Sequence, residues 1–161
     1  MVSSPALQQQ LDQKVEEIKQ AVSGISEEKA SKRPGEGEWC VKEVLSHLTG
    51  EDHAPAAQEF YERCLKEDKP ELDITPGQSA YSPEREKAPV KELLSRVETR
   101  YGELGKFLAG LNEEQLNRKA RVPFLKETPI GEYPTLGMLG MGLINFHLND
   151  HLNQLRNLSQ Q

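Results

Sequence analysis

Two histidines near the C-terminus have a spacing suited to metal binding. His147 and His151 stand four residues apart inside a long apolar run, and on an α-helix this spacing places both imidazoles on one face. The chain contains four histidines, and another of them, His47, lies in a second amphipathic run far upstream. If the two runs form facing helices, His47 meets the pair. The sequence therefore predicts one metal site with three histidine ligands.

Three histidines suit a reactive metal site better than a structural one. Imidazole nitrogen binds zinc, nickel, iron and copper, and three protein ligands leave a coordination position for water or substrate. Three neutral ligands do not compensate the charge of the ion, so a bound water becomes acidic and a bound thiol is held as thiolate. Hydrolysis and thiol transfer are the reactions that follow. The alternative is that these histidines are unrelated hydrogen-bonded residues of the core or surface.

Polar residues at helical spacing from the histidines are candidates for orienting the imidazole rings. Glu43 and Glu51 each lie four residues from His47, and Gln154 lies three residues beyond His151. The two glutamates read more simply as solvated helix charges. Gln154 is the candidate that shares a helix with the histidine pair.

The remaining reactive side chains give no further site. His53, six residues after His47, points elsewhere on an ideal helix and reads as a surface histidine. Cys40 shares a face with His47 but reads as a small buried residue rather than a ligand. No serine or threonine nucleophile motif, phosphate-binding glycine loop or dinucleotide fingerprint is present, so the catalytic and cofactor-binding residues stay unassigned.

Four amphipathic helices must position these histidines. Apolar residues recur at three and four residues over 4–22, from 38 toward 65, over 89–110 and over 135–158, which predicts helices there. Pro55 predicts a kink or break in the second helix. Gly137, Gly140 and Gly142 weaken the start of the last helix, so close helix packing is the expected reason for them. We predict an all-α four-helix bundle in a single domain, residues 1–161.

Two connections are more than simple turns. Residues 67–87 contain several prolines and little periodicity, which predicts a long crossover loop between helices that run in the same direction. Tyr81 or its neighbours could line the site, and a plain spacer is the equal alternative. Residues 121–134 predict a small irregular or ribbon segment before the last helix.

Composition and charge restrict the partners. Hydrophobic residues make up 35% and charged residues 29% of 161 residues, a balance that an amphipathic helical domain fits. The net charge of -6 and the absence of a Lys/Arg cluster argue against nucleic-acid binding. Cys40 and Cys64 form no disulfide framework or CxxC motif, and we see no secretory signal or membrane-spanning run. We expect a cytoplasmic protein with a small-molecule substrate.

Two segments resemble the DinB-like (DinB/YfiT) family. One is the proline, tryptophan and histidine segment at residues 33–48, RPGEGEWCVKEVLSHL. The other contains Gly131, the pair Thr135-Leu136, and the pattern His147-x-x-x-His151-x-x-Gln154. Together the motifs cover nearly the whole chain in the order and separation of the family.

The resemblance implies a fold, a metal and a range of activities. It implies a four-helix bundle in which His47, His147 and His151 hold a divalent metal, often nickel or zinc, near one end, and it implies frequent homodimers. Family members resemble S-transferases that use a low-molecular-weight thiol, and some relatives look like hydrolases or isomerases. Our leading hypothesis is thiol transfer to an electrophilic small molecule in detoxification or stress response. The alternatives are a metal-dependent hydrolase and a non-catalytic metal-binding stress protein.

Overall fold

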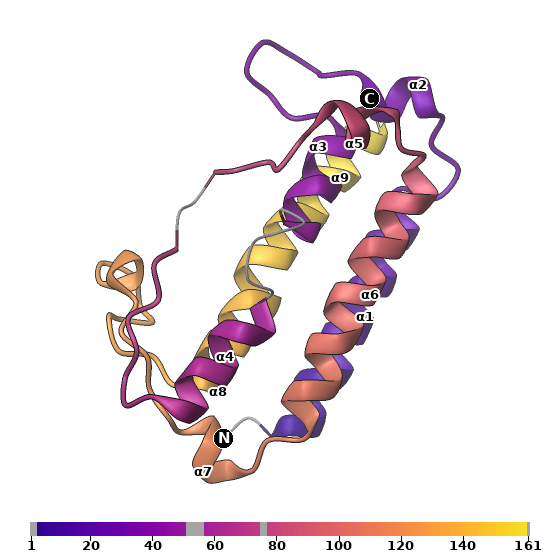
Figure 1. Ribbon diagram of the computed structural model, residues 1–161. Helices are drawn as coiled ribbons and strands as arrows, with labels where there is room; N and C mark the ends of the chain where they lie inside the picture. Colours follow the sequence, from indigo (N-terminus) through magenta and orange to yellow (C-terminus); the bar gives the residue numbers. More distant parts are fainter. Residues whose placement is uncertain (1–2, 51–56, 75–76, 161) are drawn as a thin grey trace.

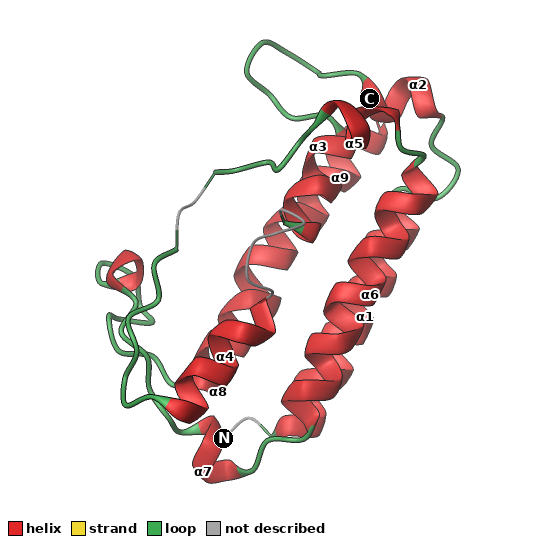
Figure 2. Cartoon of the chain, viewed as in Figure 1, coloured by secondary structure: helices red, strands yellow, loops and turns green. Residues whose placement is uncertain are grey.

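The computed structural model describes residues 3–50, 57–74 and 77–160. Within these ranges the chain is helical and contains two isolated β-bridges but no strand (Figures 1 and 2). In chain order the elements are α1 Ser4–Ala21, α2 Glu27–Ser31, α3 Val41–Thr49, α4 Ala57–Lys66, α5 Pro83–Lys87, α6 Val90–Ala109, α7 Glu113–Leu116, the 3₁₀ turn η1 Pro123–Leu125, α8 Leu136–Gly142, the π-helical segment η2 Leu143–Leu148, and α9 Asn149–Gln160.

The long elements form the predicted four-helix bundle. Its four rods are α1, the pair α3 and α4, α6, and the continuous helix made by α8, η2 and α9. Figure 1 shows α1 beside α6, and the α3–α4 rod beside the rod that ends in α9. The α3–α4 rod and α6 run in the same direction, opposite to α1 and α9 (Figure 1). The described parts of the crossover, residues 67–74 and 77–82, therefore lie along the length of the bundle, as the crossover prediction requires.

The periodic apolar residues of each rod face the centre of the bundle. On α1, Leu7, Leu11, Val15 and Ile18 are all buried, at the spacing of one helix face. Ser3 precedes the helix in extended conformation, and Pro5 lies in its first turn. The facing residues of α6 are Leu93, Val97, Tyr101, Leu104 and Leu108.

The second rod contains two helices, α3 and α4. α3 begins after Cys40, and Gly50, at a φ of +70°, ends it. The left-handed φ suits glycine, because a side chain there would be strained. The Tyr101 hydroxyl donates to the Leu48 carbonyl at 3.1 Å, which fixes the end of α3 against α6. The predictions about Pro55 and His53 concern positions outside the described residues.

A short helix in the crossover holds the end of α3, and the sequence pattern had not indicated it. Arg85 of α5 is 2% exposed, and its guanidinium donates to the Ser46 carbonyl and the Thr49 hydroxyl at 2.9 Å and to the Gly50 carbonyl at 2.5 Å. These acceptors belong to the last turn of α3 and to Gly50, which ends it. Arg85 therefore fixes the crossover to the turn that follows His47.

The segment before α8 is irregular, as predicted, and backbone hydrogen bonds and two isolated bridges hold it in place. Arg121 forms a parallel bridge with Glu71, and Lys119 forms an antiparallel bridge with Thr135. The Thr135 side chain then accepts a hydrogen bond from the Met138 backbone N–H and caps α8. The segment thus sets the start of the helix that carries two of the histidines.

The glycines of α8 allow close packing, as expected. A Cβ on Gly140 would lie 3.4 Å from both Cδ atoms of Leu7 on α1, and one on Gly142 would lie 3.1 Å from Ile130. Small residues at these points let the helix approach its neighbours. No helix among the described residues is long and apolar enough to cross a bilayer.

Candidate metal centre

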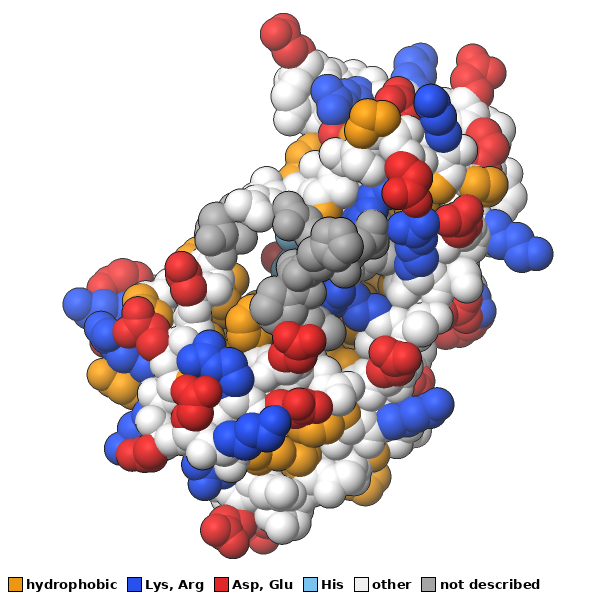
Figure 3. All heavy atoms as spheres, viewed as in Figure 1, with side chains coloured by type: hydrophobic (Ala, Val, Ile, Leu, Met, Phe, Trp, Pro, Cys, Tyr) orange, Lys and Arg blue, Asp and Glu red, His pale blue; other side chains and the backbone are white. Residues whose placement is uncertain are grey.

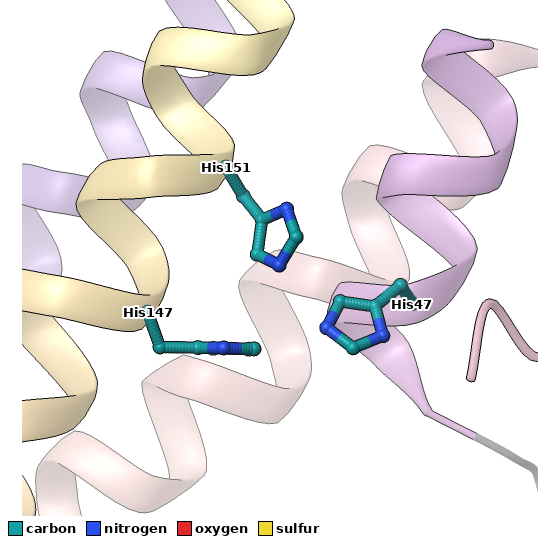
Figure 4. A group of neighbouring side chains, drawn as sticks. All are labelled: His47, His147 and His151. Carbon is teal, nitrogen blue, oxygen red and sulfur yellow. The ribbon is translucent and has the colours of Figure 1, made fainter. Parts of the chain in front are cut away.

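Three histidines from two neighbouring rods converge inside the bundle. His47 comes from the end of α3, His147 from η2 and His151 from the first turn of α9. One ring nitrogen of each lies within 4.8 Å of the others, and the rings point toward one another in Figure 4. The structure thus brings together all three histidines that the sequence singled out. They lie midway along the helix formed by residues 136–160, not near one end of the bundle as the resemblance implied.

The cluster has nearly the dimensions of a three-histidine metal site. Ring centroids are 4.6 Å apart for His47 and His151, 4.8 Å for His147 and His151, and 5.1 Å for His47 and His147. A tetrahedral zinc ion with Zn–N bonds of about 2.1 Å separates its ligand nitrogens by about 3.4 Å. Small ring rotations would bring the nitrogens from their present spacing to that one, so the donor set fits a divalent ion.

The crossover fixes the tautomer of His47. Its Nδ1 lies 2.5 Å from the Gln78 carbonyl oxygen, and because a carbonyl only accepts, Nδ1 carries the proton. The basic Nε2 is then left for the cluster. The sequence left open whether the neighbours of Tyr81 line the site or form a plain spacer. Gln78, three residues before Tyr81, contacts His47 through its backbone carbonyl.

Gln154 performs the same task for His151. The Nδ1 of His151 lies 3.0 Å from the Gln154 Oε1 one turn along α9. With the amide oxygen as acceptor, His151 also keeps Nε2 free for a metal. The predicted role of Gln154 as an orienting residue is thus consistent with the structure.

Trp39 completes the packing around two of the rings. Its indole is stacked with His151 at 6.2 Å and 10° between planes, and it lies 5.1 Å from the His47 ring. An aromatic neighbour holds the imidazoles in place without competing for their nitrogens. The sequence had marked Trp39 only as part of a family motif, and its place immediately before the His47 helix was the available signal.

Burial keeps two of the imidazoles uncharged. Burial, together with the neighbouring His151 and His47, lowers the pKa of His147 to about 4 from an ordinary 6.5. Burial also lowers the pKa of His151, against the opposing effect of the Gln154 hydrogen bond. Neutral imidazole is the form that binds a metal, so both residues are ready as ligands at neutral pH.

Glu43 has neither of the two roles expected for it. Its side chain is 4% exposed and pairs with Arg33 at 2.6 Å, while a carboxylate oxygen accepts from the Cys40 backbone N–H at 2.9 Å. Burial favours the neutral acid, but these partners outweigh it and hold the pKa of Glu43 below its usual range. Glu43 therefore caps α3 instead of contacting His47 or solvent. Glu51 lies outside the described residues.

Cys40 is buried, as expected, and takes no part in the cluster. It is 1% exposed and precedes α3, where its side chain and that of Glu43 form reciprocal capping contacts. Burial raises the pKa of the Cys40 thiol, which disfavours the thiolate that a metal would bind. Among the described residues, the three histidines are therefore the donor set.

A π-helical segment sets the register of the histidine helix. η2 spans Leu143–Leu148 and carries His147, whereas His151 lies in regular α-helix. An inserted π-turn rotates the residues that follow it relative to those before it, and such turns are common at functional sites. The sequence pattern is compatible with either helix type, so this feature could not be predicted from periodicity.

Two cavities flank the cluster. One of about 710 Å³ is lined by Trp39, His151 and Gln154 among others, and one of about 600 Å³ is lined by His147 and mostly apolar residues. Asp150, between the two histidines in sequence, borders both. Figure 3 shows histidine atoms in pale blue within a hollow on this face.

Fold and site together define a class: a four-helix bundle with three histidines gathered from two rods beside an open hollow. The family model of the DinB superfamily matches residues 10–155. The chain therefore belongs to the DinB superfamily, as its motifs indicated.

A solved structure supports the same fold. The chain is similar to YfiT from Bacillus subtilis, described as a probable metal-dependent hydrolase with an unusual four-helix bundle topology. The similarity has a TM-score of 0.77 at 22% sequence identity and covers 99% of this chain and 89% of that chain. A comparison with curated proteins found no match.

Proposed function

We propose that this protein is a metal-dependent hydrolase of small molecules, with a divalent ion, nickel or zinc, held by His47, His147 and His151. The observation that carries the proposal is the convergence of three ligand nitrogens within 4.8 Å. Hydrogen bonds from the Nδ1 atoms of His47 and His151 to separate oxygen acceptors support it, because they direct Nε2 toward the centre.

The chain supplies the ligands, their orientation and the surrounding cavities. Gln78 and Gln154 fix two ring tautomers, and Trp39 holds the same two rings by packing. A divalent ion with three neutral ligands lowers the pKa of a water or thiol at its open position. His151 lines one cavity and His147 the other, so a small molecule in either would lie beside a ligand of the ion.

The cavity linings favour hydrolysis over transfer of an acidic thiol. Neither lining contains a lysine or arginine among the described residues. A thiol cofactor that carries carboxylates would find no cation there to pair with, whereas water needs none. The description of YfiT as a probable metal-dependent hydrolase points the same way.

Thiol transfer, favoured from the sequence alone, is kept as the second candidate. Three neutral histidines would hold a thiolate as well as an activated water, so a thiol without acidic groups suits the site equally. In either case we propose a cytoplasmic protein with a small-molecule substrate. Cys40 and Cys64, buried and unpaired, suit a reducing compartment.

One paired assay tests the proposal. The protein, depleted of metal and then loaded with Zn²⁺ or Ni²⁺, is given p-nitrophenyl butyrate, and separately monobromobimane with cysteine methyl ester as a thiol without a carboxylate. We expect metal-dependent ester cleavage that is lost in His147→Ala. Metal-dependent consumption of bimane without ester cleavage would assign thiol transfer instead. Full metal occupancy with neither reaction would overturn the enzymatic proposal and leave the non-catalytic binding protein.

A further inference from the structure

The cavity beside His147 is large enough for a substrate. Its volume of about 600 Å³ lies within the range of small-molecule sites in proteins. The floor is formed by Tyr61 and Leu136, which are 6% and 0% exposed. This floor belongs to the bundle core, so the cavity is supported by fixed residues.

Large apolar side chains are left exposed around this cavity. Among the described residues, five large hydrophobic side chains are exposed, and three of them line it: Ile74, Phe124 and Phe146, at 40%, 52% and 61%. They come from the crossover, from η1 and from η2, which are distant in sequence. Scattered exposed hydrophobic residues are ordinary, but a cluster around a concave surface is typical of a ligand site.

The cavity is unsuited to anions. Asp150 is the one Asp, Glu, Lys or Arg side chain among its described lining residues. Its exposed carboxylate repels a negative group. Apart from Tyr61, Thr128 and His147, the walls are apolar and offer no side-chain hydrogen bonds to replace the water around an anion. An uncharged apolar group that enters the cavity meets no charge repulsion and gives up no strongly bound water.

The helix that carries the histidines aligns the cavity with the cluster. Leu139, Leu143, Phe146, His147 and Asp150 all line it, at spacings of three and four residues along one face. His147 thus belongs to the cavity wall and to the histidine cluster at once. A group seated among the apolar residues therefore shares the cavity with a candidate metal ligand.

We infer that this cavity binds the uncharged, apolar part of the substrate, with the bond to be cleaved at His147, and that the cavity lining discriminates against an anionic group in that part of the substrate. The inference rests on the proposed hydrolase function and assigns the class of its substrate. Esters or amides with an uncharged aliphatic or aromatic acyl group fit this class.

Binding of two related dyes tests the cavity without any reaction. N-phenyl-1-naphthylamine is neutral, and 1-anilinonaphthalene-8-sulfonate has a similar ring system with a negative charge. In the full-length, metal-free protein we expect the neutral dye to bind at least tenfold more tightly. We expect Asp150→Asn to reduce that difference, and Phe146→Ser and Phe124→Ser each to weaken neutral-dye binding about tenfold.

Tyr133→Ser is the matched control. Tyr133 is also an exposed aromatic residue, at 49%, but it is not among the residues that line the cavity. Its substitution is expected to leave the affinity of both dyes unchanged. Equal dye binding by all three serine variants, or anionic dye bound as tightly as neutral dye, would overturn the inference.

Ester chain length links the cavity to the reaction. For the Zn²⁺-loaded enzyme we expect kcat/KM at least tenfold higher for p-nitrophenyl octanoate than for the acetate, and a smaller ratio in Phe146→Ser. Zinc titration and cleavage of the acetate report the proposed function separately. Acetate cleavage with no gain from the longer chain would overturn the substrate class alone, whereas zinc binding without cleavage of either ester would overturn the hydrolase.

Discussion

The Nδ1 atom of His151 lies 3.0 Å from Oε1 of Gln154, three residues further along α9. This contact joins a candidate metal ligand to a neutral amide rather than to a carboxylate. It orients the ring without adding negative charge to the centre, which keeps an ion in the site strongly polarising.

Removal of this contact should weaken metal binding. We expect Gln154→Leu to reduce zinc affinity 10- to 100-fold, because the ring and its tautomer are no longer fixed. Gln154→Glu, which retains an acceptor, should restore most of the affinity. Competitive titration with a chromophoric chelator measures both. Gln160→Leu, an exposed site on the same helix, is the control, and equal affinity in wild type and Gln154→Leu would show that the contact does not orient the ligand.

Metal-free protein should lose stability in mild acid because of His147. Its pKa is lowered to about 4 in the fold, from an ordinary 6.5, so between these values the unfolded chain binds more protons. Stability is therefore highest above pH 6.5 and falls as the pH drops toward 4, by up to about 3 kcal/mol from this residue. Urea unfolding at pH 7.5, 5.5 and 4.5 measures the loss.

The variant His147→Gln isolates this contribution. It keeps the other titrating groups, including Glu43, so the difference between the two proteins reports His147. We expect a flatter dependence of unfolding free energy on pH in the variant. Parallel curves for variant and wild type would mean that the His147 pKa is not lowered.

Arg85 should position His47 from outside the cluster. Arg85→Met removes a donor from the Ser46 carbonyl, the Thr49 hydroxyl and the part-buried Gly50 carbonyl. The Ser46 carbonyl keeps the Gly50 N–H and the Thr49 hydroxyl as donors. We expect a loss of about 3 kcal/mol in unfolding free energy and weaker zinc binding at temperatures where the variant is folded. Arg63→Met, whose guanidinium makes an exposed ion pair, should cost less than about 1 kcal/mol. If zinc affinity is unchanged in folded Arg85→Met, Arg85 stabilises the fold without positioning His47.

The bundle and its histidine cluster could be predicted from local patterns. Apolar spacing identifies one face of each rod, and the interval from His147 to His151 places both on one side of a helix. The role of Gln154 as a partner of His151 could be predicted in the same way, because it lies three residues further along the helix. Neighbours three and four residues apart are fixed by helix geometry, so inference from sequence is strongest for them.

Contacts between distant segments could not be predicted in this way. Glu43 appeared to be a solvated helix charge because nothing in its neighbourhood indicates that Arg33, across a loop, covers it. Gln78 and Arg85 reach α3 through the crossover, whose path depends on the whole fold. The π-turn in η2 has no periodic signature, because its sequence also fits an ordinary helix.

Zinc titration of wild type, His47→Ala and His53→Ala tests the central claim most directly. His47 is the ligand that must come from a different rod, so the site exists only if the two rods hold their histidines together. Isothermal calorimetry should show one ion per wild-type chain, and His53→Ala should match it. His47→Ala should bind at least 100-fold more weakly. Undiminished binding of one ion by His47→Ala would contradict the three-histidine metal centre.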